Sequence, residues 1–232
     1  MADRGVAAET ATTTESMTRI VLRPITSPLA LGFLALGGAT LVLSGLQLGW
    51  YGPGESTAVA LALMLFGFPL QLLASIFGFL ARDIVAATGM GVLAASWLTA
   101  GAVMLLTPPG STSGALGVLL IFAGIALVIP ALAASFGKVV PALVLFTASV
   151  RFILTGIHQL SGAPAVEAMA GIMGLALLAL ALYAALALGL EDVRRKTVLP
   201  VLRVGMGREA LRGTPAEQVA GVEHEAGVRE QL

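Results

Sequence analysis

The sequence contains no cysteine and few charged residues. The absence of cysteine excludes disulfides, thiolate nucleophiles and cysteine metal sites. Charged residues make up 11% of the chain, whereas a soluble domain typically has about 25%. The formal net charge is zero, which gives no support to nucleic-acid binding. With 57% hydrophobic residues and a mean hydropathy of +0.95, the chain cannot build a water-soluble surface and is predicted to be an integral membrane protein.

Apolar runs occupy most of the chain. Six of them are long enough to cross a hydrocarbon core of roughly 30 Å as helices, which takes about 20 residues each. Their expected spans are 28–48, 57–80, 84–106, 113–134, 139–158 and 165–190. Lipid cannot satisfy open backbone groups, and no alternating strand pattern indicates a barrel. We therefore expect an all-α, polytopic membrane protein with six transmembrane helices.

Basic residues divide the loops into two groups. They occur before the first span, between the second and third, between the fourth and fifth, and after the sixth. These residues are Arg4, Arg19, Arg23, Arg82, Lys138, Arg194, Arg195, Lys196 and Arg203. The other three loops contain neither Arg nor Lys. By the positive-inside rule, both termini are expected in the cytoplasm of a multi-pass protein of the cell membrane.

Polar segments flank the expected transmembrane domain, residues 28–200. Residues 1–27 lack the apolar core of a signal peptide and are expected to form a cytoplasmic N-terminal segment. Residues 201–232 are too poor in apolar side chains to bury a core and are expected to form a cytoplasmic tail. His224, in that tail, is most simply solvated, and we expect no metal and no cofactor.

Polar side chains recur at helical spacing inside four of the spans. Gln71 and Ser75 lie four residues apart, as do Thr147 and Arg151. The other members are Thr40, Ser44, Gln47, Thr88, Ser96, Thr99, Thr155 and His158. Residues at such spacings share one helix face. The pattern is typical of a polar solute path, and equally of hydrogen bonds between membrane helices, worth about 0.6 kcal/mol each.

Arg151 is the most informative of these residues. It falls near the middle of its span, where an arginine costs at least about 2.5–3.5 kcal/mol to insert. Such a residue normally faces the bundle interior, and its fixed positive charge favours an anionic solute. Snorkelling, or pairing with Glu55 or Glu167, is the structural alternative. His158, near the outer end of the span, is a candidate for proton coupling because histidine changes its charge near neutral pH.

Three stretches of the sequence resemble the acetate uptake transporters, also called succinate–acetate permeases. The first is RPITSPLALGF, in which the residues that answer the family's opening motif are Pro28, Leu29, Leu31 and Phe33. The second spans residues 67–97, where the matching residues are Gly67, Gln71, Ala74, Thr88 and Trp97. The third is LYAALALGLEDVRRKTVLPVLRVG, in which Tyr183 and residues 197–200 are similar to the family's C-terminal signature.

The resemblance implies six-helix protomers assembled as a hexamer, each with its own path for acetate and related small carboxylates, together with protons. It also implies a pore narrowed by Phe33, by Leu93 in place of a tyrosine, and by Thr147 near the place of a leucine. The chain departs from the family pattern at several positions. Ile25 stands in place of an asparagine, Gly78 and Leu188 in place of acidic residues, and Arg151 in place of an apolar residue.

We therefore expect a permease or channel for small anions, acetate or related short carboxylates first. The expected pathway residues are Phe33, Gln71, Ser75, Thr88, Leu93, Thr147 and Arg151. The alternative is a non-transporting subunit that assembles with other membrane proteins through the small residues Ala181, Ala185 and Gly189. An enzyme is not expected, because His158 has only the loop residue Ser161 nearby and no Gly-x-Ser motif accompanies it.

Overall fold

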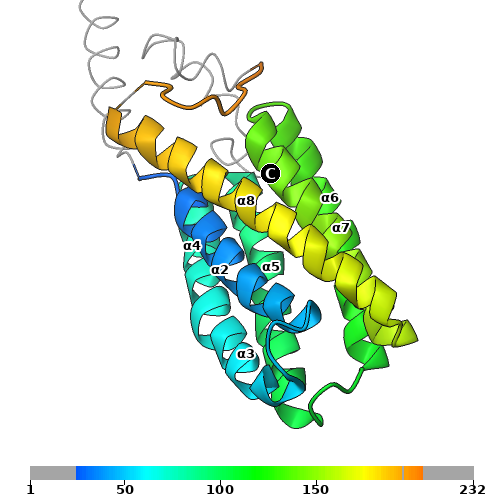
Figure 1. Ribbon diagram of the computed structural model, residues 1–232. Coiled ribbons are helices and arrows are strands. Elements are labelled where there is room, and N and C mark those ends of the chain that lie inside the picture. Colours follow the sequence, from blue (N-terminus) through cyan, green and yellow to red (C-terminus); the bar gives the residue numbers. More distant parts are fainter. Residues whose placement is uncertain (1–24, 195, 206–232) are drawn as a thin grey trace, which may run out of the picture. The chain divides into compact units, whose positions relative to one another are not determined.

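The computed structural model describes residues 25–194 and 196–205 (Figure 1). Over these residues the regular structure is helical, apart from one isolated bridge between Lys138 and Arg203. Six helical segments are long and apolar enough to cross a membrane, which confirms the six-helix prediction. They are Leu29–Gln47, Pro53–Leu80, Ile84–Leu106, Gly114–Ser135, Val139–Ser161 and Pro164–Arg194. The predictions for residues 1–24, for Arg195 and for His224 lie outside the described residues.

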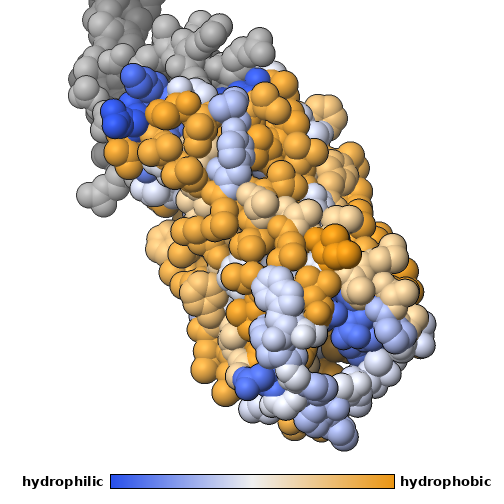
Figure 2. Space-filling model, in the orientation of Figure 1, coloured by the Kyte–Doolittle hydropathy of each residue, from blue (hydrophilic) through white to orange (hydrophobic). Residues whose placement is uncertain are grey.

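Five of the six segments are single helices. These are α2 (Leu29–Gln47), α5 (Ile84–Leu106), α6 (Gly114–Ser135), α7 (Val139–Ser161) and α8 (Pro164–Arg194). Their bounds lie close to the expected spans, although α7 and α8 each continue by a few residues at their C-terminal ends. Figure 2 shows apolar side chains over the middle of one face, with the strongly hydrophilic residues nearer its two ends. This distribution suits a protein whose middle lies in hydrocarbon.

The second segment is composite. It consists of η1 (Pro53–Glu55), α3 (Ser56–Ala62), the π turn η2 (Leu63–Gly67) and α4 (Phe68–Leu80). Pro69 is the second residue of α4 and lies two residues after the end of the π turn. Proline cannot donate a backbone hydrogen bond, and its ring crowds the carbonyl four residues earlier. The wider π turn removes that conflict, so the segment continues through Pro69 as one helical rod.

The segments alternate in direction, so their connections are divided between the two ends of the bundle. We call one the terminal end: it holds the start of α2, the short α4–α5 connection and the α6–α7 loop. The other, which we call the cavity end, holds the loops that follow α2, α5 and α7. At the terminal end Asp83 accepts hydrogen bonds from Val85 N at 3.1 Å and Ala86 N at 3.0 Å. This cap starts α5 only three residues after Ala81.

Helices α6 and α7 approach each other closely along glycines. A Cβ atom on Gly156 would lie 2.7 Å from the carbonyl oxygen of Gly117, and a Cβ on Gly117 would lie 2.9 Å from that of Gly156. Two helical turns before Gly156 on α7, Ser149 Oγ donates to the carbonyl oxygen of Gly124 at 2.6 Å. Small residues therefore bring these two backbones into direct contact, as is usual between membrane helices.

Residues 196–205 fold back over the terminal end, and we call them the C-terminal strap. Helix α7 has no side-chain cap at its N-terminus. The strap supplies acceptors instead, because Val139 N donates to Leu202 O at 3.1 Å and Val140 N to Val201 O at 3.3 Å. The Val201 side chain is fully buried. The segment that begins the predicted tail thus packs onto the bundle as far as it is described.

Charged groups hold the strap in place. Arg203 Nε and Nη2 each lie 2.9 Å from Glu191 Oε1 at the end of α8. Tyr183 Oη donates to the carbonyl oxygen of Pro200 at 2.9 Å. Burial lowers the pKa of Lys138, and the neighbouring Arg203 charge lowers it further, whereas Asp83 and Glu191 act in the opposite direction. The two carboxylates therefore offset the cost of keeping two cations beside the strap.

We predict that Arg203→Met lowers the free energy of unfolding by about 1–2 kcal/mol, because it breaks a two-point contact with Glu191 that is mostly shielded from water. Thermal unfolding of the purified protein in detergent measures the effect. Arg194→Met is the matched control, since Arg194 is exposed on the last turn of α8. Equal melting temperatures for the two variants would contradict this role of the Arg203–Glu191 contact.

Candidate functional site

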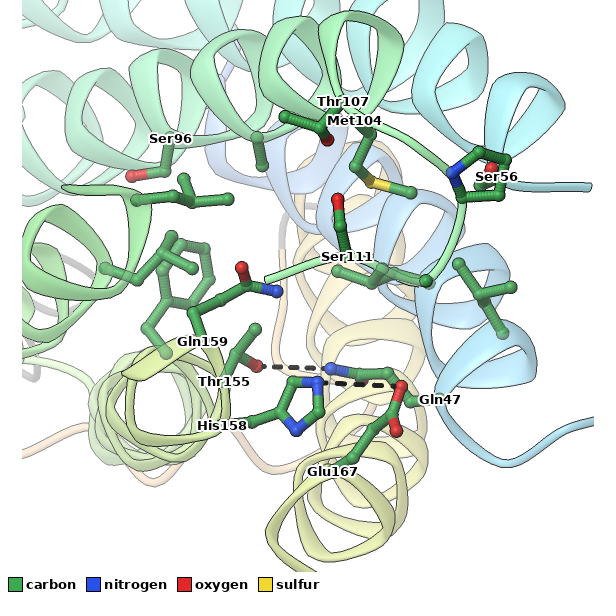
Figure 3. Close-up of a pocket in the computed structure, with 18 of the residues that line it drawn as sticks. Gln47, Ser56, Ser96, Met104, Thr107, Ser111, Thr155, His158, Gln159 and Glu167 are labelled. Atoms are coloured by element: carbon green, nitrogen blue, oxygen red, sulfur yellow. Dashed lines mark hydrogen bonds and ion pairs between the residues drawn. The ribbon is translucent and has the colours of Figure 1, made fainter. Parts of the chain in front are cut away.

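A partly open cavity of about 100 Å³ lies towards the cavity end, between α2, α5, α7 and α8 (Figure 3). Its lining combines apolar walls with polar groups, which Figure 3 shows converging from several helices and from the α5–α6 loop. The polar and charged residues of the lining are Gln47, Ser56, Ser96, Thr107, Ser111, Arg151, Thr155, His158, Gln159 and Glu167. The apolar walls include Leu43, Ala100, Leu116, Leu120, Trp97 and Phe152.

Arg151 lies deep in this cavity. It is ten residues before the end of α7, which is roughly 15 Å at the helical rise of 1.5 Å per residue. Its side chain is 1% exposed, so it does not snorkel. Within the described part of the chain, Nε and Nη2 have no hydrogen-bond partner and no carboxylate forms an ion pair with it. Pairing of Arg151 with Glu55 or Glu167, the structural alternative, is therefore not found.

An aromatic pair flanks the guanidinium group. The central carbon of the Arg151 guanidinium lies 5.7 Å from the ring centroid of Trp97. Trp97 in turn meets Phe152 edge to face, with ring centroids 5.3 Å apart. A cation over an aromatic face is stabilised by about 0.5–2 kcal/mol, which is much less than a full counter-charge supplies. The charge of Arg151 is therefore only partly compensated by these rings.

A glycine on α8 gives the guanidinium its space. A Cβ atom on Gly174 would lie 2.7 Å from Arg151 Nε and would clash with Ser44 Oγ. Ser44 and Arg151 thus reach the same point from α2 and α7. The Ser44 hydroxyl is fully buried and has no hydrogen-bond partner among the described residues. Thr40, one turn before Ser44 on the same face of α2, is also buried without a partner there.

The outer part of the cavity holds two polar pairs (Figure 3). Gln47 Nε2 donates to Thr155 Oγ1 at 3.4 Å, one helical turn beyond Arg151. Nearer the loops, His158 Nε2 lies 3.8 Å from Glu167 Oε1, and its Nδ1 lies 3.2 Å from the carbonyl oxygen of Ala163. A solute that moves inward would therefore pass the His158–Glu167 pair, then Gln47 and Thr155, and then meet Arg151.

Four of the predicted pathway residues lie in the protein core outside this cavity lining. Phe33 and Leu93 are fully buried among apolar side chains. Gln71 Nε2 donates to Gly32 O at 3.2 Å, and Ser75 Oγ donates to Ala87 O at 2.6 Å. The last two bonds join neighbouring helices, which is the routine use of such residues. Their part in a pathway stays a prediction.

The two predicted threonines lie elsewhere again. Thr88 is exposed, and its hydroxyl donates to Ile84 O of its own helix at 2.6 Å. The Thr147 hydroxyl likewise donates to Leu143 O at 2.8 Å. Neither residue lines the cavity, and a pathway role for them is also untested. Among the predicted site residues, the cavity brings together Arg151 and His158.

Sequence reasoning missed several residues of this cavity. Gln47 continues the Thr40–Ser44 stripe, so its position could have been inferred from spacing alone. Glu167 follows His158 closely along the chain across a short loop, which also favours contact. Trp97 gave no such signal, because a tryptophan inside an apolar span is usually a packing residue. Its place beside Arg151 depends on how α5 and α7 meet.

One comparison with known proteins identifies a family, and a second identifies a solved structure of the same fold. A family model described as the GPR1/FUN34/yaaH family matches residues 10–204. A solved structure described as that of the bacterial acetate channel SatP has the same fold, with a TM-score of 0.69 and 24% sequence identity. The match covers 78% of this chain and 100% of that chain. No curated protein matched the sequence.

Proposed function

Since the chain belongs to the GPR1/FUN34/yaaH family, we propose that it carries small carboxylate anions, acetate first among them, across the cell membrane. The observation that carries this proposal is a buried arginine, Arg151, that has no counter-charge among the described residues and lies at the inner part of a partly open cavity. The structural likeness to a protein described as an acetate channel supports the same reading.

The chemistry of the cavity suits a short carboxylate. Arg151 Nε and Nη2 lie side by side on the guanidinium and can donate two parallel hydrogen bonds to the two oxygens of one carboxylate. The apolar walls, among them Leu43, Ala100 and Leu120, can contact a short alkyl group. A water molecule takes up about 30 Å³ in the liquid, so a cavity of about 100 Å³ accepts a solute the size of a few waters.

The direction of the path follows from charge. Arg82, Lys138 and Arg203 belong to the terminal end, which supports a cytoplasmic position for that end. The cavity then opens on the outer side. Phe33 lies four residues from the start of α2 and Leu93 nine residues from the start of α5, both nearer the terminal end than Arg151. These two side chains form the narrow part of the path.

The protomers assemble as a homo-oligomer, a hexamer, as the family resemblance implies.

Uptake of radiolabelled acetate into liposomes that contain the purified protein tests the proposal. We expect protein-dependent uptake above that of protein-free liposomes, and uptake that saturates with acetate concentration because a fixed charge binds the anion. The second candidate is a non-transporting subunit of a membrane complex, although Ala181 and Ala185, two of the small residues expected to serve such assembly, are buried within the protomer. Intact oligomers that give no uptake at any pH would overturn the transport proposal in favour of that candidate.

His158 couples this transport to protons. The titratable or charged side chains of the cavity lining are Arg151, His158 and Glu167. When His158 is protonated, it neutralises the Glu167 carboxylate 3.8 Å away, so an approaching anion meets no net negative charge at the outer pair. Acetate uptake is therefore expected to be higher at acidic than at neutral pH, after subtraction of the leak through protein-free liposomes.

The matched variants are His158→Gln and Glu167→Gln. The first leaves the Glu167 carboxylate without a compensating cation, so its uptake should stay low at both pH values. The second removes the negative charge, so its uptake should stay high at both values. A wild-type pH dependence that persists unchanged in His158→Gln would show that the proton acts elsewhere.

A further inference from the structure

Among the unpartnered polar atoms around Arg151, groups that can donate hydrogen bonds outnumber groups that only accept them. On α2, α5 and α7, the buried side-chain atoms that lack a partner within the described chain are Thr40 Oγ1, Ser44 Oγ, Gln47 Oε1, Trp97 Nε1, Arg151 Nε and Arg151 Nη2. Hydroxyls, an indole N–H and guanidinium N–H groups all donate hydrogen bonds, while the Gln47 oxygen is the single group among them that only accepts. Buried donors without acceptors are rare in folded proteins, and a group of them indicates a missing acceptor.

The members of this group other than Thr40 are neighbours in space. Ser44 Oγ and Arg151 Nε both crowd the position that a Cβ on Gly174 would take. Trp97 lies in cation–π contact with Arg151, and Gln47, Trp97 and Arg151 line the same cavity. Three helices thus direct donor groups at a small region that the glycine of α8 keeps open.

The described carboxylates do not supply the missing acceptor. Glu167 lies against His158, Glu191 binds Arg203 in the strap, and Asp83 caps α5. Glu55 and Asp192 are exposed. A buried cation without a partner is strongly destabilising, because burial removes its hydration and nothing replaces it. Arg151 therefore lacks a counter-charge within the described residues, which favours an anion from solution.

We propose that Arg151, together with Ser44, holds a small monovalent anion as a resident counter-ion, so that the anion is a structural part of the folded protein as well as its solute. Chloride and acetate both have the required charge and size, and either can fill the site. The proposal rests on the cavity of the proposed function but not on flux. Two consequences follow: small anions stabilise the fold, and chloride competes with acetate for Arg151.

Thermal unfolding of the full chain in an uncharged detergent tests this inference. The buffer contains gluconate, whose polyhydroxy chain does not suit the apolar walls of the cavity, and chloride or acetate replaces it at constant ionic strength. We expect the melting temperature to rise saturably, by roughly 5–10 °C between gluconate and a hundred-fold excess over the dissociation constant. Chloride and acetate should reach similar plateaus, and the presence of one should raise the midpoint of the other.

Two variants separate a specific site from a general salt effect. Arg151→Met should show no response to either anion, and its melting temperature in gluconate should be at least that of the unsubstituted chain. Ser44→Ala should respond to the same extent but with a roughly ten-fold higher midpoint, because it loses one hydrogen bond to a charged ligand. It provides the decisive comparison if Arg151→Met does not fold.

An unsubstituted chain that melts at the same temperature in gluconate, chloride and acetate would overturn the inference. So would an unchanged midpoint in Ser44→Ala together with an unchanged response in Arg151→Met. The result is independent of the uptake assay. Saturable stabilisation without uptake would support the resident anion and contradict the transport proposal. Uptake without stabilisation would support transport and contradict the resident anion.

Discussion

Replacing Arg151 with methionine should reduce acetate uptake into proteoliposomes by roughly ten- to a hundred-fold. Hydrogen bonds to a charged group are worth about 1.5–3 kcal/mol each, and every 1.4 kcal/mol corresponds to a factor of ten. Methionine keeps an unbranched chain that follows the aliphatic part of the arginine side chain, so the loss reports mainly the guanidinium group with its charge and donors. Uptake by the variant should also rise linearly with acetate concentration, because the fixed binding charge is gone.

Two controls accompany this measurement. Arg151→Lys retains the charge but not the paired donors, so it should recover part of the uptake and the saturation. Arg194→Met removes an exposed arginine from α8 and should leave uptake unchanged. Unaltered, saturable uptake in Arg151→Met would remove Arg151 from the mechanism while leaving the six-helix architecture untouched.

Adding a single methyl group to Gly156 should destabilise the protein by about 3 kcal/mol, at the upper end of the cost of overpacking. The new Cβ would lie 2.7 Å from Gly117 O and 2.9 Å from Ile121 N, so it would meet backbone atoms of α6 that cannot rotate away. Helices α6 and α7 would have to separate along their contact. For a chain of this length the melting temperature should fall by roughly 6–12 °C.

Gly189→Ala is the matched control for Gly156→Ala. Gly189 also lies within a helix, but a Cβ there would have no atom within 4 Å. Alanine is favoured over glycine in a helix interior by about 1 kcal/mol, so this variant should melt at the same or a higher temperature. If both variants shifted the melting temperature in the same direction and by the same amount, the α6–α7 glycine contact would not be a source of stability.

The membrane architecture could be predicted from the sequence because its signals are local. A span is recognised from length and hydropathy alone, and the six spans agree with the helices to within a few residues. The π turn before Pro69 was not foreseen, because hydropathy does not distinguish a π turn from an α-helix. The strap was not foreseen either, because its contacts with α7 join residues far apart in the chain.

The candidate site could be predicted only in part. Arg151 stood out because a charge in the middle of a span is costly wherever the helix faces. Spacing showed that Thr88 and Thr147 lie on polar stripes, but spacing does not reveal which face meets the bundle interior. Both hydroxyls bond to a carbonyl of their own helix, a local solution that needs no neighbour. The meeting of Ser44, Trp97 and Arg151 depends on how α2, α5 and α7 pack.

The difference between this chain and the family pattern also has a functional meaning. Arg151 stands where the resemblance implies an apolar residue, so the proposed path contains a fixed charge that holds its solute. A path lined by apolar and neutral polar groups would pass an anion with little binding. The charge makes saturation, competition by chloride and dependence on the His158–Glu167 pair expected properties of this protein.

The most direct test of the central claim, that anions move through the Arg151 cavity, uses the absence of cysteine from the chain. Thr155→Cys places one thiol in the cavity lining, and Thr99→Cys places one on α5 outside that lining. A small, negatively charged methanethiosulfonate reagent is then applied to proteoliposomes. The account predicts that modification of Thr155→Cys abolishes acetate uptake and is slowed by acetate, while Thr99→Cys keeps its uptake. Fully modified Thr155→Cys protein that takes up acetate at its original rate would contradict it.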